Sequence, residues 1–296
     1  MSRYDVRGYS EVGGEDVSGL PGQMAEQAGW VAVRLRGVGT VLAVMRGKGG
    51  VGKSFVAATL AAALAASGRR VGLLDADLDG PTAGAMLGTG RQPLEVAEDG
   101  VRPATTRAGV RLMSTGLLLE EEAPLTWRDA DGEGWVWRGA QERGVLREFL
   151  SDVAWGDLDR LVVDLPPGTA RLEQLLGLVP EPGGLVAVTL PSAASAASVR
   201  RSLRVAAERG APVLGVVENM SGYACPSCGD PGPLFPGRAG EELAEEFGVP
   251  LLGRVPFDPG AAEAADGGDP DAVLASRAGG AVRDVAGVLA DGGGGA

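Results

Sequence analysis

A glycine-rich segment with two lysines and a serine is the part of this sequence best suited to chemistry. Residues 47–54 read G-K-G-G-V-G-K-S, which has the spacing G-x-x-x-x-G-K-S of the Walker A pattern. Glycines let backbone N–H groups turn toward phosphate oxygens, because a side chain there would block the approach. Lys53 is placed to reach the β- and γ-phosphates of a nucleotide, and the Ser54 hydroxyl to bind Mg²⁺. The alternative is a glycine-rich turn that arose by chance.

Acidic residues follow two other apolar segments. Asp75 and Asp77 lie in L-L-D-A-D-L-D-G-P after the segment 71–75, and Asp164 ends the segment 160–164 in L-V-V-D-L-P-P-G-T. We interpret Asp77 as the residue that orients the attacking water, and Asp75 as a carboxylate that holds a water on the metal. Asp164 has the Walker B position and is expected to bind Mg²⁺. The alternative for such an aspartate is that it caps the next helix.

Two further residues are candidates for nucleotide contacts. Gly168 follows Asp164 in a stiff P-P-G turn, and its N–H is expected to sense the γ-phosphate. Asn219 ends an apolar segment in V-V-E-N-M-S and can offer both a donor and an acceptor to an adenine edge. The predicted site therefore contains phosphate, metal and base contacts.

The only two cysteines, Cys225 and Cys228, form a C-P-S-C motif, and the chain has no histidine. Such a pair is a metal site, a redox dithiol or a surface accident. Structural zinc and iron–sulfur clusters commonly take four ligands, which one copy of this chain cannot supply from Cys and His. Two copies related by a two-fold axis supply four thiolates. The count favours one 4Fe-4S cluster per homodimer, with zinc as the plain alternative.

Composition narrows the possible partners. The 296 residues carry a net charge of −12, which argues against nucleic-acid binding, because phosphate contacts need a basic face. The absence of histidine excludes a Ser-His-Asp triad and other histidine-based catalysis. The segment from Phe55 to Ala66 is too short to cross a bilayer, and no signal peptide is visible. We expect a cytoplasmic protein with no membrane or nucleic-acid partner.

The order of apolar and helical segments predicts the fold class. Short Val- and Leu-rich segments are typical of parallel strands buried on both faces, and they alternate with helical patterns. We expect an α/β fold with a doubly wound, mostly parallel sheet and helices on both faces. Strands are predicted at 41–46, 71–75, 160–164, 185–190, 213–218 and 251–255, with another possible at 110–116. Helices are predicted at 53–67, 139–152, 171–178, 195–209, 238–247 and 274–290.

The expected organisation is one domain at 41–290, after a partly ordered arm at 1–40 and before a flexible glycine-rich tail at 291–296. Ligands of such sheets bind at the carboxyl ends of the strands, where all the motifs above fall.

The joint set of motifs resembles a known family. A lysine inside the loop, Lys48, is the mark of the deviant Walker A group, which includes the MinD/ParA ATPases, the nitrogenase iron protein and the Mrp/ApbC proteins. With D-A-D-L-D-G-P, W-R-G at 137–139, V-D-L-P-P-G-T and E-N-M-S-G-Y-A-C-P-S-C, the chain resembles Mrp/ApbC-type iron–sulfur cluster carrier ATPases over about 41–275. The resemblance implies a homodimeric P-loop ATPase that binds a labile cluster and passes it to apo iron–sulfur proteins. It also implies that Lys48 reaches the partner's nucleotide.

Taken together, these inferences define the candidate site. Lys48, Lys53 and Asp77 are the expected catalytic residues. The residues expected to contact ATP are Gly47, Lys48, Gly49, Gly50, Val51, Gly52, Lys53, Ser54, Phe55, Asp164, Gly168 and Asn219. Ser54, Asp75 and Asp164 are expected at Mg²⁺, and Cys225 and Cys228 at the cluster.

Two departures from the family pattern concern turnover. Phe55 stands where the family usually has Thr, which alters an α-phosphate or base contact. Arg171 stands where the family usually has an acid beside the P-P-G turn. Two other functions therefore stay open, a MinD/ParA-type switch and a nucleotide-binding scaffold with little turnover. The segment 274–290 carries only Arg277 and Arg283 against Asp284, which disfavours the membrane or DNA contacts of the switch.

Overall fold

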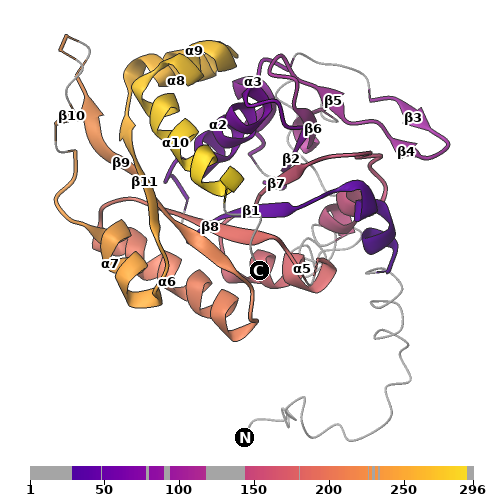
Figure 1. Ribbon diagram of the computed structural model, residues 1–296, viewed down its shortest axis with the longest axis horizontal. Helices are drawn as coiled ribbons and strands as arrows, with labels where there is room; N and C mark the ends of the chain where they lie inside the picture. The colour runs from indigo at the N-terminus through magenta and orange to yellow at the C-terminus, as the bar shows by residue number, and fades with distance from the viewer. Residues whose placement is uncertain are drawn as a thin grey trace, which may run out of the picture.

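The computed structural model describes residues 29–47, 49–77, 80–89, 94–117, 144–179, 181–225, 227–228, 231–232 and 234–291. The predicted α/β fold is confirmed, because these residues build a large and mostly parallel sheet between two layers of helices (Figure 1). The strands of this sheet are β1 (Val41–Arg46), β2 (Val71–Asp75), β5 (Ala104–Thr105), β6 (Arg111–Ser114), β7 (Arg160–Asp164), β8 (Gly184–Thr189), β9 (Val213–Ala224), β10 (Pro231–Gly232) and β11 (Leu251–Phe257).

The strand order is β10-β9-β8-β1-β7-β2-β6-β5, with β11 paired to β9. Neighbours from β11 through β6 are parallel, whereas β5 and β10 pair antiparallel with β6 and β9. A separate short hairpin joins β3 (Val96–Ala97) to β4 (Gly100–Val101). The parallel core brings the carboxyl ends of β1, β7 and β2 side by side, which is where the predicted phosphate and metal residues lie.

The helices are α2 (Lys53–Ala66), α3 (Ala83–Met86), α5 (Thr169–Leu178), α6 (Ala193–Glu208), α7 (Ala239–Phe247), α8 (Pro259–Asp266), α9 (Pro270–Ala275) and α10 (Arg277–Asp291), with 3-10 turns η2 (Leu35–Gly37) and η3 (Thr115–Leu117). Residues 29–34 and 144–151 are also helical. In Figure 1, α2, α8, α9 and α10 cover one face of the sheet, and α5, α6 and α7 cover the other. The sheet is therefore buried on both faces, as its apolar strands require.

Strand β1 shows how the two cores are separated. Its side chains alternate between the faces: Leu42 and Val44 join the cluster under α2 and α10, whereas Ala43 and Met45 join the cluster under α5 and α6. All four are nearly fully buried. Burial of each Leu, Val or Met side chain is worth roughly 1.5–3 kcal/mol, so the central strands hold the loop that follows them on a rigid base.

Two helix predictions need correction. The predicted helix 274–290 is divided into α9 and α10, because Ser276 has an extended backbone with ψ of 169° and its hydroxyl accepts a hydrogen bond from the Gly279 N–H at 3.0 Å. Helix α8 was not predicted at all. Pro259 argues against a helix at this point of the sequence, but it lies at the first helical position, where proline is tolerated. Asp258 caps the helix by accepting a hydrogen bond from the Gly260 N–H at 3.0 Å.

The other predicted segments differ only at their ends. Strands β9 and β11 extend past the predicted 218 and 255, and β6 lies inside the predicted 110–116. Of the predicted helix 139–152, the structure describes 144–151, and the remaining predicted segments match within about two residues.

The described part of the predicted N-terminal arm packs on the domain. Val31 is buried in the core cluster beneath α5 and α6, and Val38 forms a parallel bridge with Leu158. Residues 1–28 of the arm, the tail from 292, and the W-R-G motif lie outside the described residues. Within the part that the structure describes, no helix has both the length and the apolarity to span a bilayer.

Candidate functional site

The loop between β1 and α2 has its path fixed by two close approaches. A side chain at Gly47 would collide with the α6 backbone at Ser198 and Val199. Gly52 has a left-handed φ of 71°, and a side chain there would collide with the amide of Asn219. Glycine is the residue that fits both positions. The loop therefore runs directly into the N-terminus of α2, which favours anions. Lys48 lies outside the described residues.

A buried ion pair lies at the start of α2. Lys53 Nζ contacts Asp164 Oδ1, and both side chains are fully buried. The second oxygen, Asp164 Oδ2, is also buried and has no hydrogen-bond partner among the described residues. Such an atom is costly unless a ligand satisfies it. Together with the Ser54 hydroxyl in the first turn of α2, it offers the oxygen donors that Mg²⁺ prefers, so these residues fit the metal.

Asp75 anchors the segment that leads into α3. One of its oxygens accepts hydrogen bonds from the N–H groups of Thr82 and Ala83, both at 3.1 Å, and from the Ser114 hydroxyl at 3.3 Å. Burial, and secondarily the Asp164 carboxylate, raise the pKa of Asp75 to about 7, against the opposing effect of the Ala83 N–H and Lys53. The metal-water role of Asp75 stays a prediction, and the structure adds this anchoring role.

Asp77 is held by a residue that the sequence reasoning missed. Arg46 Nη2 donates to Asp77 Oδ2 at 2.9 Å, and the two side chains are only 13% and 16% exposed. The sequence does contain a signal that could have identified Arg46, because it is a charged residue at the end of the apolar segment that precedes the loop. An arginine therefore contacts the carboxylate that we expect to orient the attacking water.

An apolar cavity of about 190 Å³ opens beside the loop. Phe55, Asn219, Met220 and Phe257 contribute to its wall. Asn219 is buried, and its Nδ2 donates to the Val51 carbonyl of the loop at 2.8 Å, so at least one of its amide donors serves the loop. Met220 has a left-handed φ of 52°, an uncommon conformation for a side chain of this size and one that concentrates at functional sites. The cavity has the apolar character of a pocket for a base.

Gly168 lies four residues after the end of β7, at the N-cap of α5 with φ of 103°. Its left-handed conformation explains the glycine. Arg171 follows in the first turn of α5, where its Nη1 donates to Gln174 Oε1 at 3.1 Å. The structure thus places the predicted switch turn at the carboxyl end of β7, next to Asp164.

The two cysteines lie directly after β9 as free thiols, Cys225 half-buried and Cys228 exposed. Hydrogen bonds from the backbone of Cys228 and Ser227 lower the pKa of the Cys225 thiol. A lowered pKa favours the thiolate, which is the form that binds metal. Among the described residues, no group of three His, Cys, Asp or Glu side chains is close enough to hold a metal ion.

Partly exposed apolar side chains lie on or next to β9, β10 and β11, the strands nearest the cysteine turn. Tyr223 and Phe257 stack with ring centroids 6.2 Å apart, and both rings are about a third exposed. Leu234 and Phe235, which follow β10, are exposed to a similar extent. Exposed apolar groups gathered in this way are typical of a contact surface.

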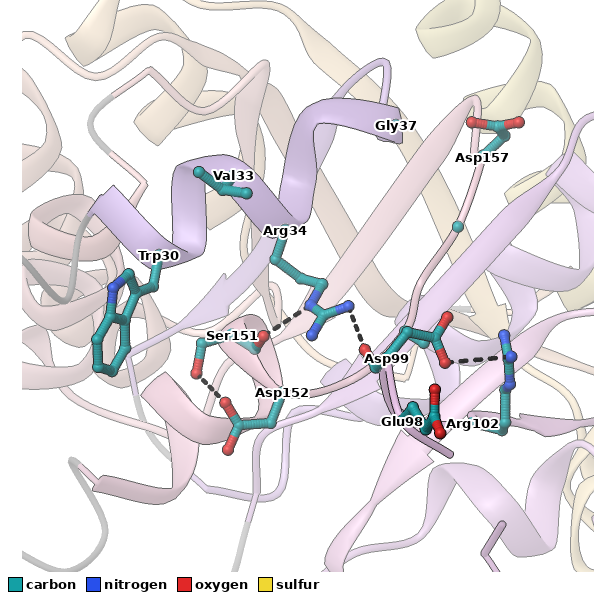
Figure 2. Close-up of a pocket in the computed structure, with 12 residues that line it drawn as sticks. Trp30, Val33, Arg34, Gly37, Glu98, Asp99, Arg102, Ser151, Asp152 and Asp157 are labelled. Atoms are coloured by element: carbon teal, nitrogen blue, oxygen red, sulfur yellow. Dashed lines mark hydrogen bonds and ion pairs between the residues drawn. The ribbon is translucent and has the colours of Figure 1, made fainter. Parts of the chain in front are cut away.

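A larger hollow lies at the opposite edge of the sheet. This groove, which we call the Trp30 groove, has a volume of about 710 Å³. Figure 2 shows Arg34 on its wall, donating to the Ser151 carbonyl at 2.7 Å and the Asp99 carbonyl at 2.6 Å. Asp99 also pairs with Arg102 at 3.2 Å, and both side chains are at least half exposed. None of the predicted site residues lies in this groove.

Comparison with known proteins gives the family. The ParA family profile described as NUBPL iron-transfer P-loop NTPase matches residues 37–289. An iron-sulfur cluster carrier protein of Saccharolobus solfataricus is 42% identical over 242 residues, covering 81% of this chain and 78% of the relative. The human cytosolic Fe-S cluster assembly factor NUBP2 is 43% identical over 230 residues, covering 76% of this chain and 82% of that protein.

Solved structures of similar proteins share the fold of this chain. A nucleotide-binding protein of Archaeoglobus fulgidus, in complex with ADP, has a TM-score of 0.69 at 35% identity and covers 82% of this chain and 93% of its own. MinD of Pyrococcus horikoshii, complexed with Mg-ADP, has a TM-score of 0.60 at 20% identity over 86% of this chain and 97% of its own, which shows a shared fold alone. From the profile match and the two relatives above 40% identity, we conclude that the chain belongs to the ParA family of P-loop NTPases, in the branch described as NUBPL iron-transfer proteins.

Proposed function

We propose that this protein is an ATP-hydrolysing carrier that binds a 4Fe-4S cluster between two copies of the chain and passes it to apo iron–sulfur proteins. The observation that carries the proposal is the course of β9. This one strand holds Asn219 against the phosphate loop at one point and presents Cys225 at its end. The relatives above 40% identity are named for cluster carriage and assembly, whereas the MinD likeness extends to the fold.

In the nucleotide half of the site, Lys53 would exchange part of its contact with Asp164 for the β- and γ-phosphates of ATP. Ser54 and the free oxygen of Asp164 would hold Mg²⁺, which supplies positive charge to neutralise the phosphates. The cavity lined by Phe55 and Asn219 would take the adenine. Lys48 of each subunit would reach the nucleotide of the other. With no histidine in the chain to act as acid or base, we expect slow turnover.

In the cluster half, each chain would provide Cys225 and Cys228, and the two-fold axis would complete the set of four thiolates. The rings of Tyr223 and Phe257, with Leu234 and Phe235, would become buried between the subunits. The cluster is cargo, so a half-exposed thiol pair on a surface turn suits release better than a closed structural site. We place the protein in the cytosol, following the names of relatives such as human NUBP2.

Anaerobic reconstitution with iron and sulfide tests the proposal. We expect about four irons per dimer, a visible charge-transfer absorbance, and transfer of the cluster to an apo-ferredoxin of the four-iron type. Cys225→Ser should lose the iron and keep ADP binding, whereas Lys53→Met should lose ADP binding and keep the iron. Zinc in place of iron after this treatment, or a full iron load on a monomer, would refute the shared cluster.

A further inference from the structure

Arg46 is the last residue of β1. The five residues before it are apolar and buried, so its guanidinium stands at the carboxyl end of a core strand. Its Nη2 donates to Asp77 Oδ2 at 2.9 Å. Its Nε is buried and finds no hydrogen-bond acceptor among the described residues. A donor in this state is rare in folded proteins and calls for a functional explanation.

The position of the ion pair follows from the order of the strands. Arg46 ends β1, and Asp77 follows β2, but β7 lies between β1 and β2 in the sheet. The side-chain contact must therefore pass over the carboxyl end of β7. That strand ends in Asp164, whose carboxylate contacts Lys53. The Arg46–Asp77 pair thus lies at the carboxyl edge of the sheet, where the Lys53–Asp164 pair and the phosphate loop also lie.

This ion pair differs from the surface pairs of the same chain. Arg102 and Asp99 are three residues apart and at least half exposed, so solvent screens their attraction. Arg46 and Asp77 are 31 residues apart in sequence and less than a fifth exposed. The contact therefore fixes the position of Asp77 relative to β1 and to the loop that follows it.

We propose that Arg46 is a positioning residue for ATP hydrolysis, which holds one oxygen of Asp77 so that the other can orient the attacking water. Within the described chain, no hydrogen bond reaches Asp77 Oδ1, which leaves that oxygen to accept from water. The water oxygen bonds to the γ-phosphorus, the bond from this phosphorus to the bridging oxygen breaks, and ADP leaves. One water proton stays on the inorganic phosphate and the other passes to solvent.

This inference rests on the proposed ATPase function, and steady-state phosphate release tests it. We expect Arg46→Met to lower kcat about tenfold, because misplacing an orienting group acts on the chemical step. The affinity for ADP should change less than about twofold, because the loop and Lys53 hold the nucleotide. Arg46→Lys, which keeps the charge, should recover part of kcat. Arg102→Met, at the Trp30 groove, is the matched arginine control and should behave as wild type.

A double variant separates positioning from direct phosphate binding. If Arg46 acts through Asp77, then Arg46→Met should lower kcat no further in a protein that already carries Asp77→Asn. Independent, multiplying effects would overturn the proposal, as would an unchanged or higher kcat in Arg46→Met. Arg46→Gln gives the same comparison should the Met variant fold poorly, which thermal unfolding by circular dichroism will show.

The same assay distinguishes a failure of the proposed ATPase function from a failure of the role of Arg46. Wild-type protein that releases no phosphate from ATP would refute the proposed ATPase, and this inference with it. Wild-type turnover that Arg46→Met leaves intact would refute the role of Arg46 alone.

Discussion

The two edges of the sheet contain the same kinds of residues in opposite settings. At the carboxyl edge, Lys53 and Asp164 are fully buried and face each other, and one carboxylate oxygen is left for a ligand. At the amino edge, the Trp30 groove is several times larger than the apolar cavity beside the loop. Its Arg34, however, is used by two backbone carbonyls, and its Asp99 pairs with Arg102 in solvent.

The difference between the two edges shows that the volume of a hollow does not decide whether the hollow can bind a ligand. A hollow whose charged groups already have partners, or stand in water, has little to offer a ligand. Buried charges that converge on a small space have been removed from water at a cost of several kcal/mol, which a bound ligand can offset. The carboxyl edge, with its buried Lys53 and Asp164, is therefore the better candidate site. Substitutions at the two edges should therefore have unequal effects.

Lys53→Met should give the largest effect. It leaves Asp164 buried without a counterion, which should cost about 3–5 kcal/mol in the free energy of unfolding and abolish nucleotide binding. Urea unfolding and fluorescent ADP titration measure the two. Adding Asp164→Asn should restore much of the stability and none of the binding. If Lys53→Met alone were as stable as wild type, the Lys53–Asp164 ion pair would not be buried as described.

Aspartates at the two edges should respond to pH with opposite signs. Asp75 has a folded pKa of about 7 against an ordinary 3.8, so the folded state holds an extra proton between these values. Its contribution to stability is full below pH 4 and is lost as the pH rises through 7, by roughly 1.4 kcal/mol per pH unit. Near the amino edge, a hydrogen bond from Arg70 lowers the pKa of Asp159 to about 2, so its contribution holds above pH 4 and is lost toward pH 2.

Urea unfolding at pH 5 and pH 8 checks the first of these signs. Wild type should lose stability relative to Asp75→Asn as the pH rises, because the variant has no proton to release. Asp159→Asn is the control, and its difference from wild type should stay constant over this range. A constant difference for Asp75→Asn as well would show that Asp75 is ionised throughout.

Asn219→Ala should give an intermediate effect. The variant loses the hydrogen bond to the Val51 carbonyl, which ties the loop to β9. A buried hydrogen bond of this kind is worth about 1 kcal/mol, so ADP should bind roughly five- to tenfold more weakly. Isothermal titration calorimetry measures the affinity for ADP, and an unchanged affinity would show that β9 does not support the loop.

Arg102→Met should give the smallest effect. Its partner Asp99 is exposed, so the free energy of unfolding should change by less than about 0.5 kcal/mol and ADP affinity should stay the same. A loss above about 1 kcal/mol in urea unfolding would remove the contrast between the two edges.

Much of the fold was predictable because the central strands are buried on both faces. β1, β2 and β7 match their predicted bounds, since a short, uninterrupted apolar segment rich in Val and Leu between polar residues strongly favours a buried strand. The division at Ser276 was not predictable from periodicity, because the apolar pattern continues from α9 into α10. The extended backbone at Ser276 and the local hydrogen bonds of its hydroxyl end the first helix.

The site was predictable where motifs carry the chemistry and not where topology does. The loop residues, Asp164 and Asn219 belong to recognisable segments, and the structure brings those it describes to one edge. The contact of Arg46 with Asp77 depends on β7 being inserted between β1 and β2, which no local pattern specifies. The hydrogen bond of Asn219 to the loop, likewise, joins residues 168 positions apart.

Strand β9 sets a length scale for the molecule. Cys225 lies six residues after Asn219, which at about 3.3 Å per residue amounts to roughly 20 Å of extended backbone. In the proposed carrier, a phosphate oxygen in the loop would thus be too remote to touch an iron atom at the thiols. In that carrier, a change of nucleotide state would have to reach the cluster through a movement of the polypeptide, without any transfer of electrons.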